Sequence, residues 1–450
     1  MDIKSRRPKS LHIAIAIVCI GVFMFIGWRI FQWIFIIDPL LGVYGMLVGY
    51  VIVQQFVLSY FFYRDPWQKA KNNPHVIEKL ENDPPRVSVV IATKNEKFII
   101  YDAVYSCLNS KYKNLEVVIV NDGSDDDGIT ETAINELVKA NPAHVKSIHL
   151  PRNLGKRKAM QVGVKRSATG EIVVFLDSDT IIDEDAIGRL VACMIDDEDL
   201  GAVVGYCRAL NADYNWLTKM QDTWYHSAFT IGKGMEHSLG TVSCCSGILS
   251  AYRMQAILPC IDRWADDHFL GSEFMAGDDR QLTAYVLGGN KYTIDKKLRQ
   301  WKTGYCESAI SISETPATMR KFVKQQIRWE QSWTRVFFFT ALWFWRGRHI
   351  LSTTDYYLRM GLSYLAPIIA IMNLVVAPAT GHWDSTIVYV LGLTLLSLLF
   401  AMDFRLYNPH TGNKWLYRVG FTFVSVGVLY FLLYYSVYTV LARKNGWLTR

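Results

Sequence analysis

The chain has 450 residues, is 51% hydrophobic and 13% aromatic, and carries a formal net charge of +7 at pH 7. We find no basic stripe typical of a nucleic-acid-binding protein, and the eight cysteines show neither a CxxC pair nor the His/Cys spacing of a zinc site. The apolar residues are concentrated at the two ends of the chain, and this distribution favours a membrane protein.

Two long apolar runs lie near the N-terminus, from Leu11 to Ile37 and from Leu40 to Phe62. Each is long enough to cross about 30 Å of hydrocarbon at roughly 1.5 Å per residue. A removable signal peptide is the alternative for the first run, but this run is too long and lacks a small-residue cleavage site. Basic residues precede the first run and follow the second, so we expect the middle of the chain in the cytoplasm, with its cysteines reduced.

Between Pro84-Pro85 and about residue 310, short apolar runs alternate with amphipathic stretches. The runs predict buried strands, and the stretches predict helices. We place the strands at 87–92, 116–120, 171–176 and 202–205, and the helices at about 98–109, 127–140, 156–168 and 183–196. Buried strands separated by helices predict a mostly parallel sheet covered on both faces, which binds ligands beyond the carboxyl ends of its strands.

Residues 212–229 and about 315–350 have aromatic, partly basic helical patterns. Both are typical of helices in a membrane interface, with a soluble core helix as the alternative. Apolar segments follow at about 356–377, 386–402 and 418–441. With the N-terminal pair these would leave the C-terminus outside, whereas its basic residues favour the inside. We therefore expect one C-terminal segment to lie in the interface or to re-enter; an extra crossing near 333–350 is the alternative.

Polar residues follow the first two predicted strands. Thr93 follows the first strand, and Asp122 follows the second in an Asp-Gly-Ser sequence. A carboxylate at a strand end suits the N–H of a base or the hydroxyls of a ribose, although Asp-Gly is also an ordinary turn. The predicted helix at about 156–168 begins with three basic residues, Lys156, Arg157 and Lys158, and cations at a helix start favour phosphate binding. The P-loop pattern is absent, and a solvated basic face is the alternative.

Asp177-Ser178-Asp179 follows the third predicted strand. Two carboxylates in one loop can bind a hard divalent cation, Mg²⁺ or Mn²⁺, which bridges to substrate phosphates and neutralises a departing diphosphate. The alternative is a cluster that caps the next helix, together with Asp183 and Glu184.

Two further motifs lie towards the C-terminal half. In Gly277-Asp278-Asp279-Arg280, two carboxylates after a glycine turn can provide a general base and a structural partner. In Gln325-Gln326-Ile327-Arg328-Trp329, an indole suits stacking on a sugar ring and a guanidinium suits a diphosphate. Each motif alone is a weak signal, but their joint occurrence in this order, beside predicted membrane spans, is a strong one.

The series of motifs resembles that of a known family. Asp122, the Asp-Ser-Asp at 177–179, the Gly-Asp-Asp at 277–279 and the Gln-Gln-Ile-Arg-Trp at 325–329 are similar to the D, DxD, (E/D)D and QxxRW motifs of processive family-2 glycosyltransferases. That family includes the cellulose, chitin and hyaluronan synthases. The resemblance covers nearly the whole chain, and it is highly specific for the family and much less so for the sugar.

Within the family, the chain looks most like the hyaluronan synthases. Cys245 to Arg253 is similar to their CSGPLxxYR stretch, with Ile248 in place of the proline, and Gly277 to Thr283 is similar to GDDRxLT. The chain ends in Trp-Leu-Thr-Arg where those enzymes carry a WGTR gating motif, so Leu448 replaces the glycine.

Two features look more like another branch of the family. The Leu448 departure resembles the rhizobial chitin-oligosaccharide synthases, which also share a Trp-Leu-Thr-Lys stretch like Trp216 to Lys219. The family is therefore clear from the sequence, whereas the sugar is left open between the two branches.

The resemblance implies an α/β, GT-A-like cytoplasmic glycosyltransferase domain carried by an α-helical transmembrane bundle with amphipathic interface helices. We divide the chain into an N-terminal transmembrane helix pair at 1–65, a linker at 66–85, the catalytic domain at 86–310, the interface helices at 311–350, a C-terminal transmembrane region at 351–442 and a gating motif at 443–450.

The resemblance also implies roles for individual residues. Asp279 would be the general base with Asp278 beside it, and Asp177 and Asp179 would bind Mg²⁺ or Mn²⁺. UDP would be bound by Thr93, Asp122, Lys156, Lys158, Asp177, Arg328, Trp447 and Arg450. The acceptor would be bound by Cys245, Ser246, Gly247, Gln325 and Trp329.

The expected function is a processive, inverting polymerase in the plasma membrane that builds a β-linked polysaccharide from UDP-sugars and exports it. The first hypothesis is a hyaluronan synthase that uses UDP-GlcNAc and UDP-GlcA. The second is a chitin-oligosaccharide-type synthase that uses UDP-GlcNAc alone. An inactive membrane scaffold is the alternative from another class, and the intact series of motifs disfavours it.

Overall fold

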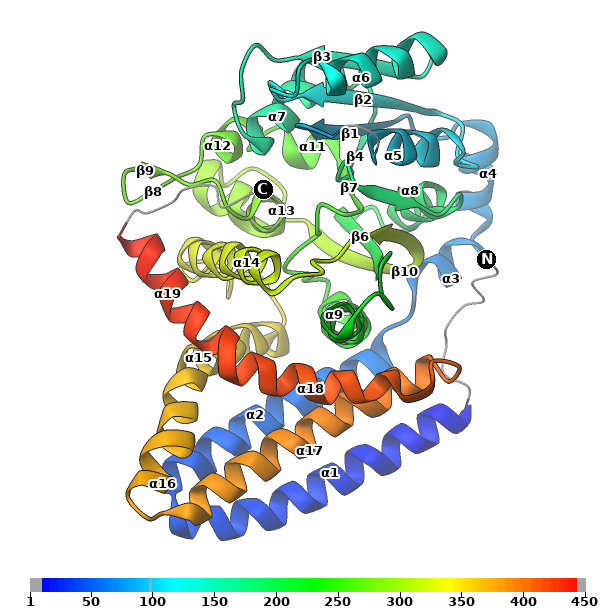
Figure 1. Ribbon diagram of the computed structural model, residues 1–450. Coiled ribbons are helices and arrows are strands. Elements are labelled where there is room, and N and C mark those ends of the chain that lie inside the picture. Colours follow the sequence, from blue (N-terminus) through cyan, green and yellow to red (C-terminus); the bar gives the residue numbers. More distant parts are fainter. Residues whose placement is uncertain (1–9, 97–98, 443–450) are drawn as a thin grey trace.

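The computed structural model describes residues 10–96 and 99–442, which form an α/β part above a layer of long helices (Figure 1). The α/β part contains an eight-stranded sheet with the order β3-β2-β1-β4-β7-β6-β10-β5. Its strands are β1 Val87–Thr93, β2 Leu115–Asn121, β3 Val145–His149, β4 Ile172–Phe175, β5 Thr180–Ile182, β6 Leu200–Ala209, β7 Ser250–Arg253 and β10 Lys302–Ser313.

The sheet is mixed, with mostly parallel pairing. β1 pairs in parallel with β2 and β4, β2 pairs in parallel with β3, and β6 pairs in parallel with β10. β7 is antiparallel to both of its neighbours, and β5 pairs antiparallel with β10 at the edge. The predicted strands at β1, β2, β4 and β6 are confirmed, whereas β3, β5, β7 and β10 were not predicted.

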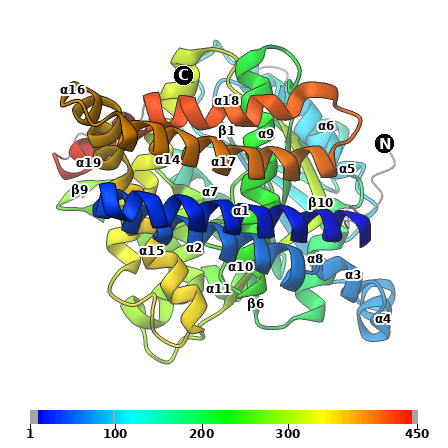
Figure 2. The same ribbon diagram turned by 90° about the horizontal axis from the view of Figure 1, so that it is seen from below.

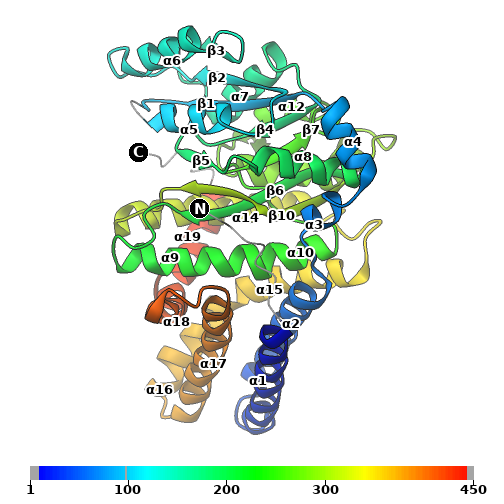
Figure 3. The same cartoon turned by 90° about the vertical axis from the view of Figure 1, so that its right-hand side faces the viewer.

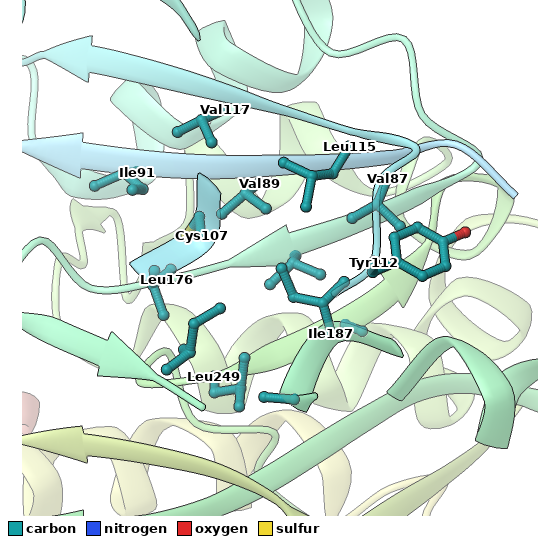
Figure 4. Close-up of a cluster of buried hydrophobic side chains, with 14 of the residues drawn as sticks. Val87, Val89, Ile91, Cys107, Tyr112, Leu115, Val117, Leu176, Ile187 and Leu249 are labelled. Atoms are coloured by element: carbon teal, nitrogen blue, oxygen red, sulfur yellow. The ribbon is translucent and has the colours of Figure 1, made fainter. Parts of the chain in front are cut away.

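The alternation of side chains along the strands builds a core on each face of the sheet. Val87, Val89 and Ile91 of β1 point into one cluster, and Val90 points into the other. The first cluster is covered by α5 Ile99–Leu108, α6 Ile129–Ala140 and α8 Ala186–Asp196 (Figure 4). The second is covered by α7 Lys156–Arg166, α11 Met254–Ile257 and α12 Ile261–Ala265. The prediction of a sheet covered on both faces is therefore confirmed.

Two long helices lie between the sheet and the lower layer, α9 Trp216–Ser227 and α14 Met319–Thr340 (Figures 1 and 3). A short helix, α13 Asp278–Ala284, packs against α14. Both long helices fall within the stretches predicted to be interface helices. Residues 341–347 form turns rather than a helix, so the alternative of an extra crossing near 333–350 is wrong.

The lower layer contains α1 Ser10–Ile37, α2 Pro39–Val57, α15 Ile350–Ile371, α17 Trp383–Tyr407, α18 Leu416–Val424 and α19 Tyr430–Leu441. Viewed from below, α1 and α2 run side by side, and α17 runs along α18 (Figure 2). Within the described residues, five helices are long and apolar enough to cross a membrane. These are Ile13–Ile37, Pro39–Ala70, Ile350–Ala379, Trp383–Tyr407 and Gly412–Leu441.

The last of these five segments begins and ends against α9 and α14, the two helices between the sheet and the lower layer. Near its start, Lys414 Nζ lies 2.8 Å from Asp222 of α9. Near its end, Thr439 Oγ1 accepts a 2.9 Å hydrogen bond from Gln331 of α14. Between these points Val426 packs in a cluster with residues of α1, α2 and α17. The segment therefore dips into the helical layer and returns to the side from which it started.

Candidate active site

The carboxyl ends of β1, β2 and β4 bring Thr93, Asp122 and Asp177 to one edge of the sheet, as parallel pairing requires. Thr93 is 2% exposed, and its hydroxyl has no hydrogen-bond partner among the described residues. The backbone N–H of Asp122 donates to the Thr93 carbonyl at 2.9 Å. These contacts place the ends of β1 and β2 next to each other.

The Asp122 carboxylate holds the loop that precedes α7. Its oxygens accept hydrogen bonds from the backbone N–H groups of Leu154 at 2.7 Å and Gly155 at 3.0 Å. Gly123 follows with a φ of 61°, and a Cβ there would lie 2.2 Å from the Arg152 carbonyl carbon, so only glycine fits. Asp122 therefore organises the loop, and its predicted contact with uracil stays a prediction.

Lys156, the first residue of α7, is the central cation of the site. Its ammonium lies 2.5 Å from Asp177 Oδ1 and 3.2 Å from Asp278 Oδ2. Burial alone would lower the pKa of Lys156, but the charges of Asp177 and Asp278 outweigh burial and raise it. The same ion pair keeps the pKa of Asp278 below its ordinary value despite burial. Lys156 thus joins the DxD loop to the Gly-Asp-Asp motif.

Lys158 does not reach this cluster. Its ammonium pairs with Glu273 at 2.8 Å and with Asp266 at 3.1 Å, on the outer side of α7. Arg157 points inward instead. From the sequence, it was predicted only to belong to the run of basic residues at 156–158. It is 4% exposed and donates to the carbonyls of Phe274 at 3.0 Å and Ala276 at 2.6 Å. Arg157 therefore anchors the segment that leads to Gly277, a role that the sequence did not reveal.

Asp179 lies on the same loop as Asp177, between β4 and β5. Burial, and then the negative charge of Asp177, raise the pKa of Asp179 to about 6. Two carboxylates close enough to affect each other in this way suit a divalent cation. Within the described residues, no group of three or more His, Cys, Asp or Glu side chains is arranged to hold a metal ion. A cation bound here would take further ligands from substrate phosphates or water.

Asp279 is held by backbone and thiol donors. Its Oδ1 accepts the Arg280 N–H at 2.7 Å, and its Oδ2 lies 3.4 Å from both the Cys244 sulfur and the Gly247 nitrogen. Burial and the neighbouring Asp278 raise the pKa of Asp279. A carboxylate that is fixed in place and more basic than usual suits the work of a general base.

The turn before Asp278 packs directly against α14. Gly277 has a φ of 73°, and a Cβ there would lie 1.9 Å from Ser332 Oγ. Glycine therefore meets two needs, a left-handed backbone and close contact with the helix. This contact brings the Gly-Asp-Asp motif and the Gln-Gln-Ile-Arg-Trp motif of α14 together.

The loop before β7 contributes Cys245, Ser246 and Gly247. Cys245 is fully buried, and its backbone N–H donates to Thr283 Oγ1 at 2.9 Å, so it supports the loop from behind. The Ser246 hydroxyl is buried without a hydrogen-bond partner in the described part of the chain. A Cβ on Gly247 would lie 3.3 Å from Asp177 Oδ1, so this residue lies between the DxD loop and Asp279.

From α14, Arg328 faces the acidic cluster, whereas the Gln325 side chain lies beside Tyr225 of α9. Arg328 is buried enough to lower its pKa, although the charges of Asp278, Asp177 and Asp279 oppose that shift. Gln325 Oε1 and Arg328 Nε are buried without partners among the residues described. Such groups cost free energy unless a ligand satisfies them.

Trp329 is stacked within the protein. Its ring lies 5.7 Å from that of Trp224 on α9, with an interplanar angle of 27°, and Trp224 in turn stacks on Phe421 of α18 at 5.3 Å. The indole thus links α14 to α9, and its predicted contact with the acceptor stays a prediction. Trp447 and Arg450 lie outside the described residues.

A mixed sheet with a DxD loop at the carboxyl ends of its parallel strands defines a GT-A-like glycosyltransferase fold. A solved mannosyltransferase, PcManGT from Pyrobaculum calidifontis in complex with GDP-Man and Mn²⁺, shares this fold with a TM-score of 0.51 and 18% identity. The match covers 86% of this chain and 99% of that one. Residues 88–258 match the family described as Glycosyl transferase family 2. This part of the chain is therefore a family-2 glycosyltransferase domain.

Curated relatives match more of the chain. An N-acetylglucosaminyltransferase of Mesorhizobium japonicum is 32% identical over 276 residues, which cover 60% of this chain and 61% of the relative. A hyaluronan synthase of Streptococcus pyogenes serotype M3 is 28% identical over 332 residues, which cover 73% of this chain and 72% of that protein. The chain thus spans about three fifths of the length of the first relative.

Proposed function

We propose that this protein is a membrane-embedded, processive glycosyltransferase that builds a β-linked polysaccharide from UDP-sugars, with UDP-GlcNAc as a donor. One observation carries the proposal: Lys156 joins Asp177 to Asp278 in a single cluster beside Asp279. Arg328 faces the same carboxylates from α14. The cluster thus combines cations for a diphosphate with a carboxylate for a hydroxyl, the two requirements of transfer from a nucleotide sugar.

Asp279 is the general base in this proposal. It takes the proton from the acceptor hydroxyl while that oxygen attacks the anomeric carbon from the face opposite UDP, which inverts the configuration. Asp278 holds Lys156 in place at 3.2 Å rather than accepting the proton, because its charge is already paired. Lys156 and Arg328 stabilise the charge that develops on the leaving diphosphate.

The DxD carboxylates fit a divalent cation, because Asp177 and Asp179 lie on one short loop between β4 and β5, at the carboxyl end of β4. Mg²⁺ or Mn²⁺ bound to Asp177 and Asp179 would neutralise the diphosphate. The unpartnered hydroxyl of Thr93 supports a place for the nucleotide at the end of β1. Asp122 supports the same site through the loop before α7, and Trp447 and Arg450 are proposed to close over it.

The acceptor is proposed to lie between the Cys245–Gly247 loop and α14. Ser246 and Gln325 each offer a buried polar atom without a protein partner among the described residues, and a sugar hydroxyl would satisfy both. Trp329 would form the wall of this space, with its ring fixed by Trp224.

The helical layer is proposed to cross the plasma membrane four times, with α1, α2, α15 and α17. The segment Gly412–Leu441 would re-enter the bilayer, since both of its ends contact the helices α9 and α14 on the side of the sheet. Four crossings leave the catalytic domain and the C-terminus in the cytoplasm, which agrees with the basic flanks. The polymer would leave through the helical layer. A C-terminal tag that is accessible only from the outside of intact cells would contradict this topology.

Two products remain as candidates, and different observations favour them. The Cys245–Arg253 stretch and the streptococcal relative favour a hyaluronan synthase that alternates UDP-GlcNAc and UDP-GlcA. Leu448 and the 32% identical N-acetylglucosaminyltransferase favour a synthase that uses UDP-GlcNAc alone.

Donor omission separates the two candidates. Purified protein in lipid nanodiscs would receive UDP-GlcNAc, UDP-GlcA or both, with Mn²⁺, and the products would be sized by electrophoresis and identified by hyaluronidase and chitinase digestion. Long polymer from UDP-GlcNAc alone would contradict the hyaluronan candidate, and polymer that requires both donors would contradict the chitin-type candidate. If no sugar is transferred from any UDP-sugar, the proposal that the protein is a glycosyltransferase is contradicted. Asp279→Asn serves as the inactive reference in these assays.

A further inference from the structure

The loop from Thr241 to Gly247 and the short helix before it each contact helix α15. Thr241 Oγ1 lies 2.9 Å from Ser352 Oγ, near the start of α15. About two turns further along the helix, Arg359 Nη2 donates to Glu236 Oε1 at 2.7 Å. Glu236 belongs to the short helix α10 Gly234–Ser238, which precedes the loop. The loop therefore lies between the proposed base and a helix of the lower layer.

Glu236 also holds the loop itself. Its Oε2 accepts the Ser243 N–H at 3.0 Å, and its Oε1 accepts the Ser243 hydroxyl at 2.7 Å. The side chain is buried, and burial alone would raise the pKa of Glu236, but Arg359 and the bonds from Ser243 outweigh burial and lower it. The carboxylate is thus ionised at neutral pH, and losing either partner would leave a buried charge poorly satisfied.

The residue after Ser243 contacts the proposed base, Asp279. Cys244 follows Ser243, and its sulfur lies 3.4 Å from Asp279 Oδ2. The Gly247 N–H approaches the same oxygen at 3.4 Å. Lys233 donates to the Cys244 carbonyl and so fixes the backbone between these contacts. A continuous path of direct contacts therefore runs from Arg359 on α15 to the proposed base.

We propose that Glu236, paired with Arg359, is a positioning residue for sugar transfer. It holds the 241–247 loop where Cys244 and Gly247 fix the Asp279 carboxylate, and it makes the placement of the base depend on the position of α15. The inference rests on the proposed function, because it assigns Asp279 to the acceptor hydroxyl. Glu236 itself would touch neither sugar nor nucleotide.

Glu116 provides a matched control for Glu236. It is also a buried carboxylate that accepts a backbone N–H, from Thr169 at 2.7 Å, and a serine hydroxyl, from Ser88 at 2.7 Å, and it pairs with Lys146 at 2.7 Å. Glu116 lies on β2, and its partners do not touch the loop or Asp279. Glu116→Gln and Glu236→Gln therefore remove one charge from similar environments, and only the second should disturb the loop.

The first test is kinetic and uses full-length protein in nanodiscs with UDP-GlcNAc. Glu236→Gln is expected to lower kcat for transfer about tenfold or more, while the donor KM stays within about twofold of wild type. Arg359→Lys, which keeps a cation opposite Glu236, is expected to retain more transfer than Arg359→Met. If Glu116→Gln and Glu236→Gln lower the thermal unfolding midpoint by the same amount, Glu116→Gln should still lower kcat much less than Glu236→Gln. Wild-type kcat in Glu236→Gln would overturn the positioning role.

The second test needs no turnover. Cys244 is partly exposed, so its alkylation by N-ethylmaleimide, followed by mass spectrometry of the peptide, reports the position of the loop. Glu236→Gln is expected to increase the rate at Cys244 about tenfold, with no such increase in Glu116→Gln. Equal rates in both variants would overturn the inference even in an inactive preparation. If the wild type transfers no sugar but Glu236→Gln changes the alkylation of Cys244 as expected, only the proposed function would be overturned.

Discussion

The ammonium of Lys156 lies 2.5 Å from Asp177 Oδ1, and this contact joins the first turn of α7 to the loop after β4. The two residues lie 21 positions apart in the chain and come from elements on the same edge of the sheet. The lysine therefore counters the charge of the DxD loop from a fixed position, and a bound diphosphate would meet both the lysine and any metal ion at that loop.

This geometry predicts different effects for two lysines of α7. Lys156→Met is expected to lower kcat/KM about 100-fold, because it removes the cation that pairs with both Asp177 and Asp278. Lys158→Met is expected to stay within about threefold of wild type, because its surface pairs with Glu273 and Asp266 contribute little. UDP release at a series of donor concentrations measures both. Equal losses in the two variants would contradict the separation of their roles.

The role of Asp279 predicts the acid side of the pH profile. The base must be ionised to accept a proton, and burial and Asp278 raise its pKa. An ordinary aspartate titrates near pH 4. As the pH is lowered, activity should therefore begin to fall at a higher pH than an ordinary aspartate would give. Asp279→Asn should lower kcat about 1,000-fold at a pH where the wild-type carboxylate is ionised, since it removes general-base catalysis, and the loss should shrink as the pH falls and the wild-type base is protonated. A variant with unchanged kcat would require a different base. Asp278→Asn, which removes a partner of Lys156 instead, should lower donor affinity as well.

Metal dependence should vary with pH through Asp179. Its pKa is raised to about 6 by burial and Asp177, so below that pH the proton competes with a cation for the carboxylate. The Mn²⁺ concentration that gives half-maximal activity is expected to rise steadily as the pH falls below about 6, and to vary little above pH 7. Titrations of chelator-treated protein with Mn²⁺ and Mg²⁺ at several pH values measure this. Full activity in excess chelator would remove the metal from the proposal.

Gly277 predicts a steric effect. Gly277→Ala places a methyl group 1.9 Å from Ser332 Oγ at a left-handed φ of 73°, so α13 and α14 must separate. Activity should fall at least about tenfold, because Asp279 and Arg328 move apart. Gly271→Ala is the matched control, since Gly271 has a φ of 82° with nothing within 4 Å of the added methyl group. If both variants behave alike, backbone strain rather than contact with Ser332 explains the effect.

The central strands and helices could be predicted from the sequence because each is a local pattern of burial. Val87 to Ala92 is an almost continuous apolar run, and β1 occupies that place with one residue more. β10 was not predicted, because its Lys302–Ser313 sequence is rich in small and polar residues and is stabilised by pairing with β6 and β5. β7 was not predicted either, since four residues are too few for a clear pattern.

The candidate site was predicted as a set of motifs, and only part of its arrangement followed from them. The parallel sheet brings Thr93, Asp122 and Asp177 to one edge, as strand order alone implies. The sequence did not distinguish the inward Arg157 from the outward Lys158, because residues at successive helix positions point about 100° apart and nothing local states which face is buried. The contact of Cys244 with Asp279 could likewise not be predicted from the spacing of the motifs, since the two residues lie 35 positions apart in the chain.

The sequence by itself determined the type of protein: apolar segments at both ends, a buried α/β pattern between them, and acidic motifs at the expected strand ends. These are consequences of local hydrophobicity and spacing. Only the tertiary structure decided which charges pair, that Trp329 stacks on Trp224, and that the last apolar segment returns to the side of the α/β part. The physical reason is that burial and ion pairing depend on partners from distant segments, and their positions are set when the helices and sheet pack together.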